Sequence, residues 1–86
     1  ANKLANKQIR CNSITPGNLI FEGSVWENKK MEDIDNFKKY LYDKVPLNNI
    51  GLPVDIYHAL KFIISTKAQF ITGANFIIDG GQLRKW

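Results

Sequence analysis

Cysteine and histidine are almost absent from this 86-residue chain, which contains one of each, Cys11 and His58. A lone cysteine cannot form an internal disulfide, and one cysteine with one histidine is too few for a zinc site. Cys11 stands near Ile9 and Ile14, which favours a buried, unreactive thiol. His58 falls inside a helical pattern without the partner residues that a catalytic histidine needs. We therefore expect no disulfide, no metal and no histidine-based catalysis.

Long hydrophobic runs are also missing from the sequence. None approaches the roughly 20 apolar residues that a membrane helix needs. The opening residues, Ala-Asn-Lys-Leu, lack an initiator methionine and are not followed by the apolar stretch and cleavage site of a signal peptide. We therefore expect a cytoplasmic protein without membrane contact, in a chain that begins within a domain.

Basic residues exceed acidic ones, so the formal net charge is +4. Nucleic-acid binding would require basic residues on one face with aromatic residues between them. The densest lysines are instead interleaved with carboxylates. These residues are Lys29, Lys30, Lys38, Lys39 and Lys44 among Glu27, Glu32, Asp33, Asp35 and Asp43. Such a mixture is typical of a solvated helix surface, so we expect no nucleic-acid partner.

Two helices are predicted from apolar spacing and end signals. The first spans Asp33 to Lys44, with apolar residues at helical spacing, carboxylates at its start and lysines at its end. The second spans Pro53 to Ser65, with proline suited to the first helical position and one apolar stripe. Residues through about Ala5 look like the end of an earlier helix, and residues 18–23 look like a loop.

Two strand candidates flank these helices. Gln8 to Ile14 is stopped by the turn signal Thr15-Pro16-Gly17, and Ala74 to Asp79 carries an apolar run typical of a buried strand. The long helical segment between them implies a crossover and a parallel sheet. Two parallel strands cannot form a stable sheet alone, so further strands have to come from elsewhere. A chain of this length also buries only about 60% of its unfolded surface when it folds alone.

Three segments carry motifs in a distinctive order. Residues 9–17 read Ile-Arg-Cys-Asn-Ser-Ile-Thr-Pro-Gly, residues 46–56 read Pro-Leu-Asn-Asn-Ile-Gly-Leu-Pro-Val-Asp-Ile, and residues 72–81 read Thr-Gly-Ala-Asn-Phe-Ile-Ile-Asp-Gly-Gly. In order and spacing they resemble Ile-Arg-Val-Asn-x-Ile-x-Pro-Gly, Pro-Leu-x-Arg-x-Gly-x-Pro-x-Glu-Ile and Thr-Gly-x-x-x-x-Val-Asp-Gly-Gly. These are motifs in the last third of the short-chain dehydrogenase/reductase family.

The resemblance implies an α/β fold: the carboxyl-terminal part of a doubly wound Rossmann-type parallel sheet, with its last two strands and the intervening helices. Residues 1–86 would then be a fragment of a single oxidoreductase domain. Such proteins transfer hydride between NAD or NADP and a carbonyl or alcohol. By match to the family, Pro16, Gly17 and Leu19 are the cofactor-binding positions beside the nicotinamide, at the carboxyl end of a strand where such sheets bind ligands. Gly17 would let the backbone approach closely.

The sequence departs from the family pattern at two places. The family often has threonine where this chain has Phe21, which cannot donate a hydroxyl hydrogen bond to the cofactor. Asn49 stands near a frequent arginine, a change expected to affect packing or assembly. The Thr-Pro-Gly turn argues mildly against the enoyl-reductase branch of the family.

The resemblance also assigns residues 21–45 to the substrate-binding loop and helices. Trp26, Phe37 and Tyr40 are candidates to line a substrate pocket. Phe37 lies on the apolar stripe of the predicted helix, so a packing role explains it at least as well as a substrate contact. Trp26 is the preferred substrate-binding residue because its segment has no regular period.

The family's catalytic groups have no counterpart in this chain. The glycine-rich phosphate turn, the catalytic serine and the Tyr-x-x-x-Lys pair, which gives or takes a proton as hydride moves, are not found. Tyr57 and Lys61 have the right spacing but lie in the late helix, so we interpret them as coincidence. We therefore expect the piece alone to be inactive.

Family members are commonly homotetramers. The resemblance implies a homo-oligomer contact through the Pro53–Ser65 helix and the Ala74–Asp79 strand, although an ordinary buried strand explains that apolar run equally well. Two other interpretations stay open, a self-contained basic binding module and a degenerate, non-catalytic family member. Substrate identity and the choice between NAD and NADP cannot be read from these residues.

Overall fold

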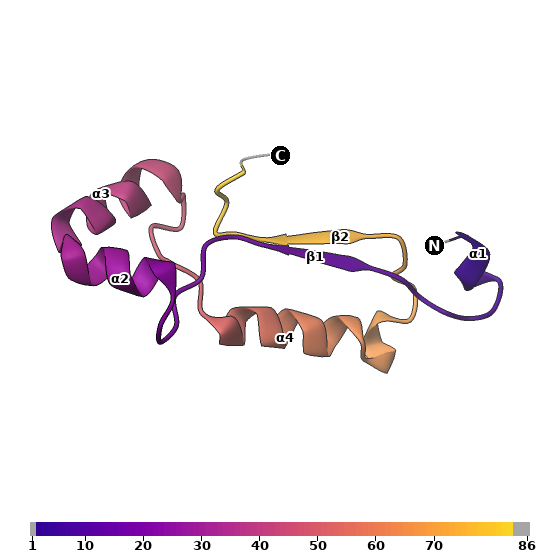
Figure 1. The fold of residues 1–86 in the computed structure, drawn as a ribbon. Coiled ribbons are helices and arrows are strands. Elements are labelled where there is room, and N and C mark those ends of the chain that lie inside the picture. Colours follow the sequence, from indigo (N-terminus) through magenta and orange to yellow (C-terminus); the bar gives the residue numbers. More distant parts are fainter. Residues whose placement is uncertain (1, 84–86) are drawn as a thin grey trace.

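Two short parallel strands lie side by side in this computed structural model, which describes residues 2–83 (Figure 1). Strand β1 spans Ser13–Pro16 and strand β2 spans Asn75–Ile78. They pair in parallel, from Ser13 opposite Asn75 to Pro16 opposite Ile78. The predicted parallel pairing of these two segments across a helical connection is therefore confirmed.

The segment before β1 is shaped by the end of a preceding helix. Helix α1 spans Asn2–Ala5, in agreement with the predicted helix end; Ala1, which that prediction included, lies outside the described residues. Gln8 has a φ of 60°, and the N–H of Ile9 donates to the carbonyl of Leu4 over 3.1 Å. This six-to-one hydrogen bond is the Schellman pattern of a helix terminus. Gln8 therefore belongs to the helix end, and the strand starts later than predicted.

The strand also continues further than the turn signal indicated. Pro16 is its last residue, and the N–H of Gly17 still donates to the carbonyl of Ile78 over 2.8 Å. Proline costs little here, because the N–H groups of Ser13 and Gly17 donate to β2 and strand alternation turns the nitrogen of Pro16 toward the other edge. The turn therefore begins after Gly17 rather than at Thr15.

Helix α3 spans Ile34–Lys44, close to the predicted limits. Asp33 caps it, because its side chain accepts a hydrogen bond from the N–H of Asn36 over 3.1 Å. The apolar stripe points Phe37 and Leu41 inward, and both are buried. Capping and periodicity thus agree on this helix.

Helix α4 spans Pro53–Ile63 and lies alongside one face of the two strands (Figure 1). Asp55 accepts a hydrogen bond from the N–H of Leu52 over 2.8 Å and so holds the helix start. The helix ends before the predicted Ser65, whose side chain caps a short 3-10 helix, η1, at Thr66–Ala68. The hydroxyl of Ser65 therefore stops the α-helix and starts the next turn.

Arg10 ties the end of α4 to the loop that precedes β2. Its guanidinium donates to the carbonyls of Ile71 at 3.0 Å, Ile63 at 2.9 Å and Ser65 at 3.4 Å. A cation suits the carbonyl end of a helix, where the backbone dipole is negative. This contact joins the segment before β1 to the helix packed below the sheet.

Helix α2, Val25–Glu32, was not predicted from the sequence pattern, although the family resemblance placed helices within residues 21–45. It contains no buried residue, so it has no apolar stripe for a periodicity argument to find. Its start carries a local signal: the hydroxyl of Ser24 accepts from the N–H of Glu27 over 3.1 Å, and Glu27 accepts from the N–H of Gly23 over 3.2 Å. The spacing Ser-x-x-Glu is typical of a capping box and could have located this helix.

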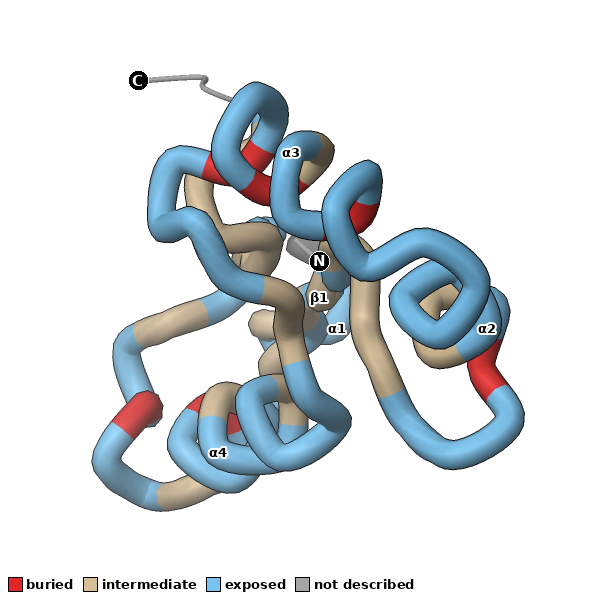
Figure 2. The backbone as a smooth tube through the Cα atoms, turned by 90° about the vertical axis from the view of Figure 1, so that its left-hand side faces the viewer, coloured by how far each residue is buried: buried red, intermediate tan, exposed pale blue. Residues whose placement is uncertain are grey.

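The hydrophobic core is small and lies in the helical part of the molecule. Phe37, Leu41 and Val45 form its buried cluster, with Trp26 and Tyr40 among the partly buried residues packed against it. Buried residues are few along the whole tube in Figure 2. The radius of gyration is 16.2 Å, whereas about 12 Å is expected for a compact domain of this length. The chain is therefore elongated.

The predicted burial of Cys11 is wrong, because its thiol is exposed. Each strand of a two-stranded sheet pairs along one edge only, so the residues leading into β1 have no cover on the other side. Ile9 is 46% exposed for the same reason. Within the part of the chain that the structure describes, no helix has the length and apolar character to cross a membrane.

Candidate functional site

The carboxyl ends of the two strands meet at Gly17. A Cβ at this position would lie 2.6 Å from Cβ and 2.7 Å from Cα of Asp79. Real side chains do not approach backbone atoms so closely, so only glycine fits without a shift of one strand end. Packing against the neighbouring strand is a sufficient reason for glycine here, whatever else binds beside it.

The segment after Gly17 pairs with the start of α4. The N–H of Ile20 donates to the carbonyl of Gly51 over 2.8 Å, and the N–H of Gly51 donates to the carbonyl of Asn18 over 3.1 Å. Leu19 and Gly51 thus form a parallel bridge. In such a bridge the N–H and carbonyl of the middle residue face away from the partner. The backbone groups of Leu19 therefore face the side opposite Gly51.

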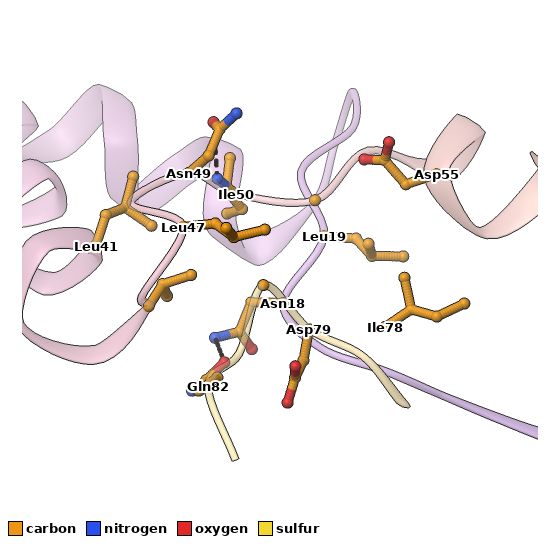
Figure 3. Close-up of a pocket in the computed structure, with 13 residues that line it drawn as sticks. Asn18, Leu19, Leu41, Leu47, Asn49, Ile50, Asp55, Ile78, Asp79 and Gln82 are labelled. Carbon is orange, nitrogen blue, oxygen red and sulfur yellow. Dashed lines mark hydrogen bonds between the residues drawn. The ribbon is translucent and has the colours of Figure 1, made fainter. Parts of the chain in front are cut away.

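A cavity of about 410 Å³ opens beside this bridge, beyond the carboxyl ends of the strands (Figure 3). In open α/β sheets, ligands bind in the crevice at this edge. Its walls come from the turn after β1, the end of α3, the α3–α4 connection and the turn after β2. They are Asn18, Leu19, Leu41, Val45, Leu47, Asn49, Ile50, Gly51, Asp55, Ile78, Asp79, Gly80 and Gln82.

A second cavity of about 240 Å³ lies on the strand side of the same turn. Pro16 and Gly17 line it, whereas Leu19 lines the larger cavity. The three predicted cofactor-binding residues thus lie in one turn that borders two cavities. Asn18, Asp79 and Gln82 border both cavities.

The acidic groups at this edge are engaged in holding the backbone. The carboxylate of Asp79 accepts hydrogen bonds from the N–H groups of Gly81 at 2.9 Å and Leu83 at 3.0 Å. Asp55 caps α4. Among the described residues there is no cluster of three or more histidine, cysteine, aspartate or glutamate side chains that could hold a metal ion. The site therefore offers shape, amide and backbone hydrogen-bonding groups, and two carboxylates that already accept hydrogen bonds from the backbone.

Sequence reasoning missed a polar network on the wall of the larger cavity. The amides of Asn18 and Gln82 both donate to the hydroxyl of Tyr40 over 3.0 Å, and Asn18 also donates to Gln82 over 3.3 Å. The first and last of these residues are 64 positions apart. No local pattern in the sequence signals a contact of this kind, because only the tertiary fold brings its members together.

Trp26 lies in the helical part and is not among the residues that line these two cavities. Its ring is 4.9 Å from that of Tyr40 and 6.4 Å from that of Phe37, and Lys29 Nζ lies 4.6 Å from its centroid. Trp26 therefore packs α2 onto α3. Its role as a substrate-binding residue stays a prediction.

Phe21 and Tyr57 are both solvent-exposed, at 53% and 55%. The side chain of Phe21 stands at the family's threonine position, where its ring offers no hydroxyl. Tyr57 lies on α4 with its ring 5.6 Å from that of His58. Neither residue lines the two cavities.

Comparison with known proteins gives consistent matches along the chain. A family model described as enoyl-(acyl carrier protein) reductase matches residues 1–82. An uncharacterized oxidoreductase of Thermotoga maritima is 37% identical over 83 residues, which cover 95% of this chain and 32% of that protein. An L-rhamnose 1-dehydrogenase (NAD(P)(+)) of Sphingomonas sp. is 33% identical over 79 residues, covering 92% of this chain and 30% of that protein.

Solved structures give the same picture. A 4-hydroxyisoleucine dehydrogenase complexed with NADH matches with a TM-score of 0.82 at 32% identity, over 100% of this chain and 34% of that one. A short chain dehydrogenase family protein from Francisella tularensis matches with a TM-score of 0.80 at 30% identity, over 99% of this chain and 37% of that one. The chain spans about a third of the length of the curated relatives it matches.

The matched region therefore includes the two strands and the α-helices of the described residues, together with both turns at the carboxyl edge of the sheet. These elements have the Rossmann-type arrangement of the solved relatives. This chain belongs to the short-chain dehydrogenase/reductase family.

Proposed function

We propose that residues 1–86 form the carboxyl-terminal part of a single Rossmann domain in an NAD(P)-dependent oxidoreductase. The whole protein transfers hydride between the nicotinamide cofactor and a small carbonyl or alcohol substrate. The observation that carries this proposal is the backbone of Leu19. It lies at the carboxyl edge of the sheet, beside a cavity of about 410 Å³, with its N–H and carbonyl facing away from Gly51.

These features fit one end of a nicotinamide. A carboxamide carries both a donor and an acceptor, and the backbone of Leu19 offers the complementary pair. Pro16 and Gly17 precede Leu19 in the turn and line the neighbouring cavity, and neither residue extends a flexible side chain from the turn. When bound, the cofactor supplies or accepts the hydride. The role of this chain is to hold the ring in register with the substrate.

Residues 21–45 form the substrate lid in this proposal. Helices α2 and α3 pack on each other through Trp26, Phe37 and Tyr40, and the chain enters α2 directly from the cofactor turn. A lid of this kind excludes water and closes over the substrate. Trp26 is the proposed substrate-binding residue.

The chain does not supply proton transfer. The family's catalytic serine, tyrosine and lysine have no counterpart in these 86 residues, so we propose that this piece alone is inactive. The active protein is proposed to be cytoplasmic and a homotetramer, with α4 and β2 at one subunit contact. Exposed apolar residues on α4 support that contact, since Val54 is 45% and Leu60 44% exposed.

Relatives with named substrates support a carbonyl or alcohol. They include an L-rhamnose 1-dehydrogenase (NAD(P)(+)), a glucose 1-dehydrogenase and a 3-oxoacyl-[acyl-carrier-protein] reductase. The family model that matches this chain is described as an enoyl-(acyl carrier protein) reductase. The expectation that this chain lies outside the enoyl-reductase branch therefore stays a prediction.

The test is a hybrid enzyme in which this chain replaces the matching carboxyl-terminal part of the Sphingomonas L-rhamnose 1-dehydrogenase. The expected result is saturable NADH or NADPH binding by the hybrid and cofactor turnover with a small carbonyl or alcohol substrate, assayed over a panel that includes L-rhamnose. Neither the 86-residue chain nor the remaining part of the Sphingomonas enzyme should do this alone. A folded hybrid that binds neither cofactor would refute the proposal. Tight, salt-sensitive nucleic-acid binding by the 86-residue chain would instead favour a basic binding module.

A further inference from the structure

Three residues from distant parts of the chain meet at the hydroxyl of Tyr40. Asn18 follows the proposed cofactor turn, Tyr40 lies on α3, and Gln82 follows β2. Both amides donate to the hydroxyl over 3.0 Å, and Asn18 donates to Gln82 over 3.3 Å. The Asn18–Gln82 contact is drawn in Figure 3. The hydroxyl thereby joins the turn after β1 and the turn after β2 to one helix.

The ring of Tyr40 belongs to the proposed lid. It stacks on Trp26 at 4.9 Å with an interplanar angle of 39° and packs against the buried cluster of α3. One side chain therefore has its ring in the lid and its hydroxyl on the cofactor turn. Because the side chain is half-buried, its hydrogen bonds are shielded from competition with water.

Asn18 stands immediately before Leu19, whose backbone is proposed to bind the carboxamide. The carbonyl of Asn18 is fixed by Gly51 and its side chain by Tyr40. These two contacts hold the residue on both sides.

We propose that Tyr40 is a positioning residue that couples the cofactor turn to the substrate lid through Asn18 and Gln82. The inference rests on the proposed function. Cofactor bound at the turn favours the turn conformation in which Asn18 donates to the hydroxyl of Tyr40. This hydrogen bond in turn orders the lid. By thermodynamic reciprocity, an ordered lid strengthens cofactor binding by the same factor.

The test compares Tyr40→Phe with Tyr42→Phe in the complete oxidoreductase, either the hybrid described above or the full-length polypeptide that carries this sequence. Tyr40→Phe removes the shared hydroxyl and keeps the ring on Trp26. Tyr42 lies two positions away on the same helix and is 78% exposed, so Tyr42→Phe is the matched control. For each protein, NADH affinity is measured, and amide hydrogen exchange across residues 25–44 is followed with and without NADH.

NADH is expected to slow exchange across residues 25–44 in the parent and in Tyr42→Phe but not in Tyr40→Phe. Tyr40→Phe should also bind NADH about five- to tenfold more weakly, as expected for the loss of one or two hydrogen bonds. A role confined to packing would lower stability without changing the NADH-dependent protection. Equal protection and affinity within twofold in all three proteins would overturn the coupling. Absence of both NADH and NADPH binding by the parent would refute the proposed function itself.

Discussion

Replacing Gly17 with alanine tests the closest contact at the carboxyl edge of the sheet. The new Cβ would stand 2.6 Å from Cβ and 2.7 Å from Cα of Asp79. One contact atom is backbone and the other is attached directly to it, so the clash cannot be relieved by a side-chain rotation. Overpacking of this kind costs about 1–3 kcal/mol, and we expect a value near 3. The two strand ends should separate, which breaks the hydrogen bond from the position-17 N–H to Ile78.

Gly23→Ala is the matched control. Gly23 has a φ of +81°, and no atom lies within 4 Å of the place that a Cβ would take, so alanine there meets backbone strain without a clash. That strain costs about 1 kcal/mol. A loss of 1 kcal/mol lowers the melting temperature by about 2–4 °C in a protein of about 150–250 residues. In the hybrid enzyme, Gly17→Ala should therefore lower the melting temperature about three times as much as Gly23→Ala does.

Amide exchange distinguishes a local clash from general destabilisation. The position-17 amide should exchange fast in Gly17→Ala and stay protected in Gly23→Ala, because only the first variant pushes β1 from β2. If Gly17→Ala costs no more than Gly23→Ala and keeps that amide protected, the reasoning about the strand contact is refuted.

Three further substitutions test other contacts in the hybrid. Arg10→Met should lower the free energy of unfolding in urea by about 1.5–3 kcal/mol, because the guanidinium donates to three carbonyls; an unchanged midpoint would contradict this. Phe21→Thr should strengthen NADH binding about threefold in a titration, since a hydroxyl becomes available at the family's threonine position, and weaker binding would refute that role. Trp26→Phe should raise KM for the substrate that the hybrid turns over more than it changes NADH affinity, and an unchanged KM would remove Trp26 from the substrate site.

Much of the fold could be predicted because several local signals agree. Helix α3 has a capping aspartate and an apolar stripe, and α4 has a proline at its start and a similar stripe. The parallel pairing of β1 with β2 followed from chain connectivity alone. Helix α2 was missed because none of its residues is buried, although the Ser24-x-x-Glu27 spacing marks its start.

The site was predictable only where residues are adjacent in the sequence. Pro16, Gly17 and Leu19 lie in one motif, and the structure gathers them around one turn. The contacts of that turn come from elsewhere: Asp79 limits the space at Gly17, and Gly51 orients the backbone of Leu19. These depend on how strands and loops pack, which the sequence pattern does not encode locally. The predicted burial of Cys11 was wrong for the same reason, because the exposure of a residue beside a strand depends on which other strands lie next to it.

The most direct test of the central claim is a titration of the hybrid enzyme with NADH, followed by nuclear magnetic resonance of selectively labelled glycine and leucine amides. The account predicts saturable shifts at Gly17 and Leu19, with little change at Gly23, which lines neither cavity. Saturable NADH binding with unchanged Gly17 and Leu19 signals would contradict the assignment of this turn to the nicotinamide.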